Sequence, residues 1–246
     1  MKPSFSAALA LSLVVVGAVA ASADPVRIVQ DQRLAAASVT LGRDTSPSNS
    51  DAASDRLTST ATLTSGTSST TANAIVTSSF AEPLHWFGIG TADGSTATQG
   101  IVGASDSLAN FGVRFDVREP VAYTFNGRFE TSSSFGGPLP AEFGDATWSV
   151  LLFQQIPGGS EFFRAQAHTP DVRSFAGTLE PDEYFLLVKA HTNIHTTDGT
   201  ATAGFNFTFD LAPLNAAPTP EPASLLLLGT AIAVFGVRRQ KRTVQP

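Results

Sequence analysis

The stretch FGVRFDVREPVAYTFNGRF, residues 111–129, contains two runs in which large apolar residues alternate with polar or small ones. An alternation with a period of two predicts a β-strand that buries one face, because successive side chains of a strand point to opposite sides. The apolar positions of the first run are Phe111, Val113, Phe115 and Val117. Glu119 and Pro120 interrupt the pattern, and a second run begins at Val121. The stretch therefore predicts two consecutive half-buried strands.

Further short strands are expected downstream, separated by turn-forming residues. The predicted segments are TWSVLLFQQ (147–155), FFRAQAH (162–168), the strand that follows the turn in GTLEPDEYFLLVKAHTNI (177–194), and FNFTFDL (205–211). The segments 129–146 and 195–204 are expected to be loops, and 147–155 is expected to be a central strand because it is apolar throughout. Short strands at regular spacing, with no amphipathic helix between them, predict an all-β fold, an antiparallel β-sandwich.

The segment 38–80 is unusual because 21 of its 43 residues are Ser or Thr. Such a composition permits disorder, yet Thr is also a favourable strand residue. We expect a loop over 44–55 and one or two Thr-rich strands over 57–80, with Leu57, Ser59 and Ala61 on one face.

Tyr184 follows Leu179-Glu180-Pro181 at the start of a predicted strand. This arrangement is similar to a tyrosine corner, in which the hydroxyl bonds back to the backbone a few residues upstream. A structural role is therefore expected for Tyr184, with ligand binding as the alternative.

The charge of the chain is concentrated between its two ends. The whole chain has 15 basic and 21 acidic residues, whereas residues 24–222 hold ten basic residues and all 21 acidic ones, a net of −11. An acidic body argues against nucleic-acid binding, which needs basic patches. The chain has no cysteine, so the fold must be stabilised by packing and no thiolate can act as nucleophile or metal ligand.

The N-terminus has the pattern of a secretory signal peptide. Lys2 precedes an apolar run from Ala7 to Ala20, which ends in an A-x-A site formed by Ala21 and Ala23. The run is short for a membrane span. Cleavage by signal peptidase is expected to leave a mature chain that begins near Asp24.

The C-terminus carries a second apolar run. Residues 223–237 are uncharged and, as a helix, would extend about 22 Å across a hydrocarbon core about 30 Å thick. The cations Arg238, Arg239, Lys241 and Arg242 follow at once and are expected to stay on the cytoplasmic side. The run therefore predicts a single hydrophobic helix of marginal length for a membrane span, which is either a transient insertion or a permanent anchor.

Pro220, Glu221 and Pro222, the apolar run and the basic cluster together resemble a PEP-CTERM sorting signal. The resemblance implies an exported protein of a Gram-negative bacterium that makes exopolysaccharide. It also implies removal of the tail by exosortase, a membrane-embedded cysteine transpeptidase-like enzyme. The body resembles the jelly-roll-like domains that often precede such tails, down to a closing Phe-x-Phe-x-Phe pattern at 205–209.

The expected organisation has six parts. These are a signal peptide (1–23), an N-terminal strand with a Ser/Asp-rich loop (24–56), the β-sandwich (57–213), a Pro-rich linker with the PEP motif (214–222), the hydrophobic helix (223–237) and a basic cytoplasmic tail (238–246).

Few residues are candidates for catalysis, metal binding or ligand binding. His191 and His195 are four apart, but on a strand they would lie about 14 Å apart, too far to share one zinc ion. With Lys189 and Asn193 they are expected to form a polar outer face, and ligand contact by His191, Asn193 and His195 is the alternative. Trp86 beside a turn is expected to anchor the core, with stacking on a sugar ring as the alternative.

Sequences that mark a nucleophile elbow, a phosphate loop or a zinc protease are absent. We therefore expect no catalytic residues, no bound metal and no cofactor. Asp93 and Asp198 lie in stretches that could contact Ca²⁺, and turn chemistry explains them equally well.

The expected function is that of an exported, exosortase-processed surface or extracellular-matrix protein, associated with exopolysaccharide in a biofilm. The first alternative is a carbohydrate-binding or Ca²⁺-assisted adhesion module. The second is a secreted glycan hydrolase, whose paired carboxylates carry no short sequence motif.

Overall fold

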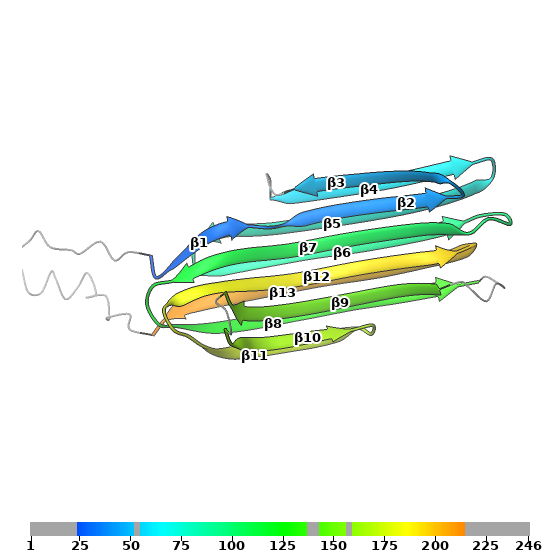
Figure 1. The fold of residues 1–246 in the computed structure, drawn as a ribbon. Coiled ribbons are helices and arrows are strands. Elements are labelled where there is room, and N and C mark those ends of the chain that lie inside the picture. The colour runs from blue at the N-terminus through cyan, green and yellow to red at the C-terminus, as the bar shows by residue number, and fades with distance from the viewer. Residues whose placement is uncertain (1–23, 52–54, 137–142, 156–158, 215–246) are drawn as a thin grey trace, which may run out of the picture. The chain divides into compact units, whose positions relative to one another are not determined.

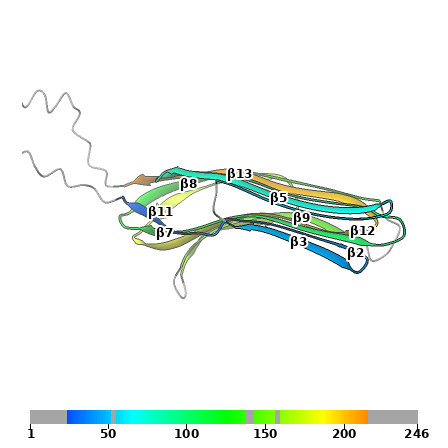
Figure 2. The same cartoon turned by 90° about the horizontal axis from the view of Figure 1, so that it is seen from above.

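The computed structural model describes residues 24–51, 55–136, 143–155 and 159–214. These residues form strands and connections with no α-helix, and two antiparallel sheets pack face to face (Figures 1 and 2). No helix among them is long and apolar enough to span a membrane. The prediction of an all-β antiparallel sandwich is confirmed. The signal peptide and the C-terminal helix lie outside the described residues.

The first sheet has the strand order β10-β9-β12-β7-β2-β3, and β1 also pairs with β7. Its strands are β1 (Val26–Asp31), β2 (Leu34–Leu41), β3 (Asp44–Asp51), β7 (Gly103–Val117), β9 (Phe143–Gln154), β10 (Glu161–Ala167) and β12 (Asp182–Thr196).

The second sheet has the order β11-β8-β13-β6-β5-β4. Its strands are β4 (Arg56–Ser65), β5 (Ser68–Glu82), β6 (His85–Ala97), β8 (Val121–Phe135), β11 (Asp171–Leu179) and β13 (Asp198–Pro213). Along β6 to β13 the neighbours are nested: β6 pairs with β13, β7 with β12, β8 with β11, and β9 with β10.

Residues 111–129 include the connection between the two sheets. The first alternating run lies in β7 of the first sheet, and the second lies in β8 of the second sheet. Glu119 and Pro120 form the connection, because proline cannot donate to a strand ladder. The apolar residues of both runs face the space between the sheets, and Phe111, Val113, Phe115 and Phe125 are fully buried.

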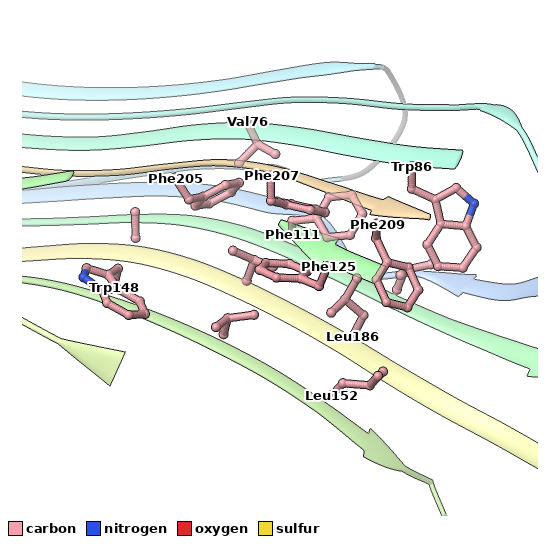
Figure 3. Close-up of a cluster of buried hydrophobic side chains, with 14 of the residues drawn as sticks. Val76, Trp86, Phe111, Phe125, Trp148, Leu152, Leu186, Phe205, Phe207 and Phe209 are labelled. Atoms are coloured by element: carbon pink, nitrogen blue, oxygen red, sulfur yellow. The ribbon is translucent and has the colours of Figure 1, made fainter. Parts of the chain in front are cut away.

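The core is dominated by aromatic rings from both sheets (Figure 3). Phe111 and Phe207 meet edge to face at 4.8 Å, and Phe129 stacks on Trp148 at 4.0 Å. Two glycines of β6 make room for such rings: an added Cβ would lie 2.5 Å from the Phe207 ring at Gly88 and 2.3 Å from the Phe205 ring at Gly90. Small inward residues on one strand therefore admit the large ones of its neighbour.

Several expected loops are strands. The expectation of a loop over 44–55 was wrong, because Asp44–Asp51 is β3 and pairs with β2 from end to end. The loop expected over 195–204 was also wrong, since only Thr197 separates β12 from β13. The loop expected over 129–146 is shorter, because β8 continues to Phe135 and β9 begins at Phe143. Backbone ladders with neighbouring strands supply the stability that these polar sequences lack by themselves.

The structure also tests two expectations for the N-terminal half of the chain. The Thr-rich segment forms two strands, β4 and β5, and Leu57, Ser59 and Ala61 are buried as predicted. The domain boundary that was expected at residue 56 does not separate a unit from the sandwich, because β1, β2 and β3 belong to the first sheet.

The strand over 147–155 was expected to be central. It lies between β10 and β12, second from the edge of the first sheet.

Tyr184 forms the expected corner, with its hydroxyl donating to the Glu180 carbonyl at 2.8 Å. Burial raises the pKa of Tyr184 to about 12, so the hydroxyl stays protonated and keeps donating at neutral pH. We expect Tyr184→Phe to lower the free energy of unfolding by about 1 kcal/mol, the usual net contribution of one hydrogen bond. Urea titration measures this, and an unchanged unfolding midpoint would show that the corner contributes nothing.

Candidate functional site

The outer face of the first sheet carries the polar residues that the sequence singled out. On β12 the residues Val188, Ala190, Thr192 and Ile194 are fully buried, so the residues between them must point outward. These outward residues are Lys189, His191, Asn193 and His195, all half-buried. The expectation of a polar outer face on this strand is confirmed.

The two histidines do not come together. His191 lies opposite Leu108 of β7 and Thr147 of β9, whereas His195 lies opposite Ala104 and Phe143. The ring of His195 stacks against the ring of Phe143, with centroids 5.3 Å apart. In the described part of the chain, no group of three or more His, Cys, Asp or Glu is placed to hold a metal ion.

Asp106 of β7 connects His191 with Asn193. One of its carboxylate oxygens, Oδ2, lies 3.0 Å from Nε2 of His191 and accepts a hydrogen bond from Nδ2 of Asn193 at 3.3 Å. The contact is possible because β7 and β12 pair in a register that sets Asp106 directly opposite Asn193. Sequence reasoning missed Asp106, since 85 residues separate it from His191.

The carboxylate of Asp106 changes the proton affinity of His191. The hydrogen bond raises the pKa of His191 above its ordinary value, and partial burial of the ring opposes the shift without cancelling it. Because the folded-state pKa is raised, protonated His191 stabilises the fold fully below the unfolded value of about 6.5. This contribution is lost as the pH rises through the folded-state pKa.

We therefore expect Asp106→Asn to lower the pKa of His191. An NMR titration of the imidazole carbon-bound protons measures it directly. Asp210→Asn is the matched control, because Asp210 pairs with His85 on the other sheet and should leave His191 unchanged. A His191 titration midpoint that is the same in Asp106→Asn and in the unaltered protein would contradict the assignment.

A second carboxylate–histidine pair lies near the first. Asp145 of β9 is directly opposite Asn193, and its Oδ1 lies 2.6 Å from Nδ1 of His168. Asp106, Asn193 and Asp145 thus form a row across three neighbouring strands.

Beside this row a shallow hollow of about 310 Å³ is lined by residues that include Leu108, Thr147, Ser149, Lys189 and His191. The arrangement offers hydrogen-bond donors and acceptors on an open sheet face.

Trp86 is not part of any exposed surface. It is 0% exposed and packs against Phe80, Phe115 and Phe209. Its indole Nε1 donates to the carbonyl of Pro83 at 3.1 Å. The alternative in which Trp86 stacks on a sugar ring was wrong, because the inward face of β6 leaves no room for a ligand, and Trp86 is a core anchor.

Asp93 and Asp198, the Ca²⁺ candidates, lie in strands rather than in loops. Asp93 is in β6, opposite Asn73 and Thr202, and Asp198 is the first residue of β13, opposite Ala97. The two aspartates are thus held at different positions along the ladder of β6 and β13.

Fold and site together define an all-β, two-sheet sandwich with open polar outer faces. Residues 218–241 match the family model of the PEP-CTERM protein-sorting motif. The resemblance of the tail is therefore confirmed, and the chain carries the sorting signal of an exported protein whose processing partner is exosortase. The motif residues Pro220, Glu221 and Pro222, the basic cluster and the signal-peptide site at Ala21 and Ala23 lie outside the described residues.

No curated protein matches the chain. Among solved structures, one described as "CBM4 structure and function" is similar at 10% identity, with 55% of this chain and 88% of that chain covered and a TM-score of 0.21. A likeness at that score carries no argument about fold or ligand.

Proposed function

We propose that this chain is an exosortase-processed protein of the cell surface or extracellular matrix of a Gram-negative bacterium, where its β-sandwich associates with exopolysaccharide. The observation that carries the proposal is the sorting motif over residues 218–241. The signal peptide directs export, the tail halts transfer in the inner membrane, and processing frees residues from about Asp24 to the PEP motif.

The properties of the sandwich suit this role. An exported body with a net charge of −11 and no cysteine stays soluble without disulfides. The nested pairing of β6 with β13, β7 with β12, β8 with β11 and β9 with β10 is that of a jelly roll with β1 to β5 added to its sheets. Jelly rolls occur in lectin domains, which bind carbohydrate without transforming it.

The location is tested by fractionation. Antibody against the sandwich should label intact cells or the extracellular matrix, and deletion of the coding region should weaken cohesion of the biofilm. A protein found only in the cytoplasm would overturn the proposal.

The sandwich is proposed to be non-enzymatic. Asp106 and Asp145 are the carboxylates that most resemble a catalytic pair, because both flank Asn193 on one face. Two strand spacings put their backbones about 10 Å apart, whereas the carboxyl groups of inverting glycosidases are about 6.5–9.5 Å apart. Each carboxylate, however, is held by a histidine on an open sheet face rather than in a water-excluding cleft.

We expect no release of reducing sugars when the exported protein is incubated with exopolysaccharide of the source organism. The variants Asp106→Asn and Asp145→Asn should behave as the unaltered protein does. Turnover that either substitution abolishes would establish a glycan hydrolase instead.

Binding of carbohydrate without turnover is the second candidate function. The observation that favours it is the row of Asp106, Asn193 and Asp145, with Lys189 and His191 beside it, since amide, carboxylate and ammonium groups can bond to sugar hydroxyls.

A further inference from the structure

The outer face of the second sheet contains a glycine that the packing of the core does not require. Gly204 lies in the interior of β13, between the inward residues Ala203 and Phe205, so its missing side chain would point outward. No register shift occurs there, and Gly204 pairs directly with Thr91 of β6. Glycine in a strand interior is unfavourable and often marks close approach by a ligand or another backbone.

Gly204 differs from the inward glycines of the same sheet. Aromatic rings fill the space beside Gly88 and Gly90, whereas a Cβ on Gly204 would meet only the carbonyl of Gly90 at 3.3 Å and the Thr91 methyl at 3.8 Å. Among the described residues, no aromatic ring atom lies within 4 Å of that Cβ position, although the Gly204 backbone itself is buried. The missing side chain therefore leaves space on the surface rather than in the core.

That space is part of an open hollow of about 370 Å³ across β6, β13 and β8. This volume is within the range of about 300 to 1,000 Å³ that is usual for small-ligand sites. The outward side chains around its glycine floor are Ile89, Thr91, Arg128, Glu130 and Asn206.

The lining residues fit a polyhydroxylated, uncharged molecule. Ile89 is 44% exposed and offers an apolar surface to the carbon-bound hydrogens of a sugar ring. Nε of Arg128 lies 3.0 Å from Oε1 of Glu130, so the two charges cancel while their remaining donors and acceptors face solvent. With Asn206 and Thr91, they present hydrogen-bonding groups of both kinds around one apolar contact.

We propose that the hollow over Gly204 binds a neutral saccharide and is a point, separate from the row of Asp106, Asn193 and Asp145, at which the sandwich contacts polysaccharide. The inference rests on the proposed association with exopolysaccharide and gives it a site, on the sheet opposite to His191 and Asn193. An anionic polymer suits the hollow less, because Glu130 offsets Arg128 and the body is strongly acidic.

The test uses the exported protein with four probes: cellohexaose, maltohexaose and mannohexaose as neutral chains, and an oligogalacturonate as the anionic one. Titration calorimetry gives the affinity, and amide NMR shifts locate the contact. We expect at least one neutral chain to bind, with shifts centred on Ile89, Gly204 and Asn206.

Three substitutions in the hollow and one matched control outside it test whether the saccharide binds at this site. Asn206→Ala and Arg128→Ala, both at exposed positions, should each weaken binding by about tenfold, which corresponds to one well-placed hydrogen bond. Gly204→Val should fill the hollow and abolish binding. Asn73→Ala, on the same outer face but in β5 and outside the hollow, should leave the affinity unchanged.

The inference is overturned if no neutral chain binds, if the oligogalacturonate binds best, or if the affinity survives Asn206→Ala and Arg128→Ala. Intact-mass analysis of the same protein separates this result from the proposed function. A correctly processed surface protein that binds no neutral chain overturns only the site, whereas an unprocessed protein that binds overturns the proposed sorting.

Discussion

Glu221→Ala is expected to hold the exported protein in the inner membrane with Arg238, Arg239, Lys241 and Arg242 still attached. The sorting motif matched over residues 218–241 places Glu221 between two prolines, just before the apolar run. Proline on both sides disfavours helix, so the backbone at Glu221 is expected to be extended and open to an enzyme. Loss of the Glu221 carboxylate removes the one charged group in this linker that a processing enzyme could recognise.

Intact-mass spectrometry measures the effect in cells that contain exosortase. The unaltered surface protein should begin near Asp24 and lack residues 225–246, whereas the Glu221→Ala protein should retain them and fractionate with the inner membrane. Glu119→Ala is the matched control, because Glu119 also precedes a proline but belongs to the connection between β7 and β8. If the unaltered surface protein retains Arg238 to Arg242, the chain is tail-anchored and the sorting proposal is wrong.

Trp86→Ala is expected to cause the largest loss of stability among the substitutions considered. The indole is fully buried and lies against three aromatic rings, with centroids 5.0 Å from Phe115, 5.5 Å from Phe209 and 5.9 Å from Phe80. Truncation of a buried tryptophan removes its transfer free energy and leaves a cavity, which together cost about 3–5 kcal/mol. For a domain without disulfides this is a large part of the total stability.

Chemical denaturation followed by circular dichroism measures the change. Phe87→Ala is the matched control, since Phe87 is the next residue of β6, points to the opposite face and is 36% exposed. We expect Phe87→Ala to cost about 1 kcal/mol or less. Equal losses at the two positions would show that Trp86 does not anchor the core.

The strands that the sequence predicts most clearly are those with large apolar residues at every second position. Phe205, Phe207 and Phe209 identify β13, and the alternation from Phe111 to Val117 identifies β7, because a two-residue period is visible within a few residues of sequence. Two segments that were expected to be loops, β3 and the first part of β13, are rich in Ser, Thr, Asp and Gly. Such residues form strands or loops equally well until a neighbouring strand offers ladder hydrogen bonds.

The same distinction applies to the functional residues. By itself the sequence determined that the chain is exported and sorted, since the tail acts through contiguous residues, and that His191 and Asn193 share one strand face, since this follows from local alternation. Only the tertiary structure decided that Asp106 meets His191, that Trp86 is inaccessible, and that Gly204 lies in a hollow beside Arg128 and Asn206. Those contacts depend on which strands pair and in what register. Strand pairing joins residues far apart in the chain, so no local pattern of residues records it.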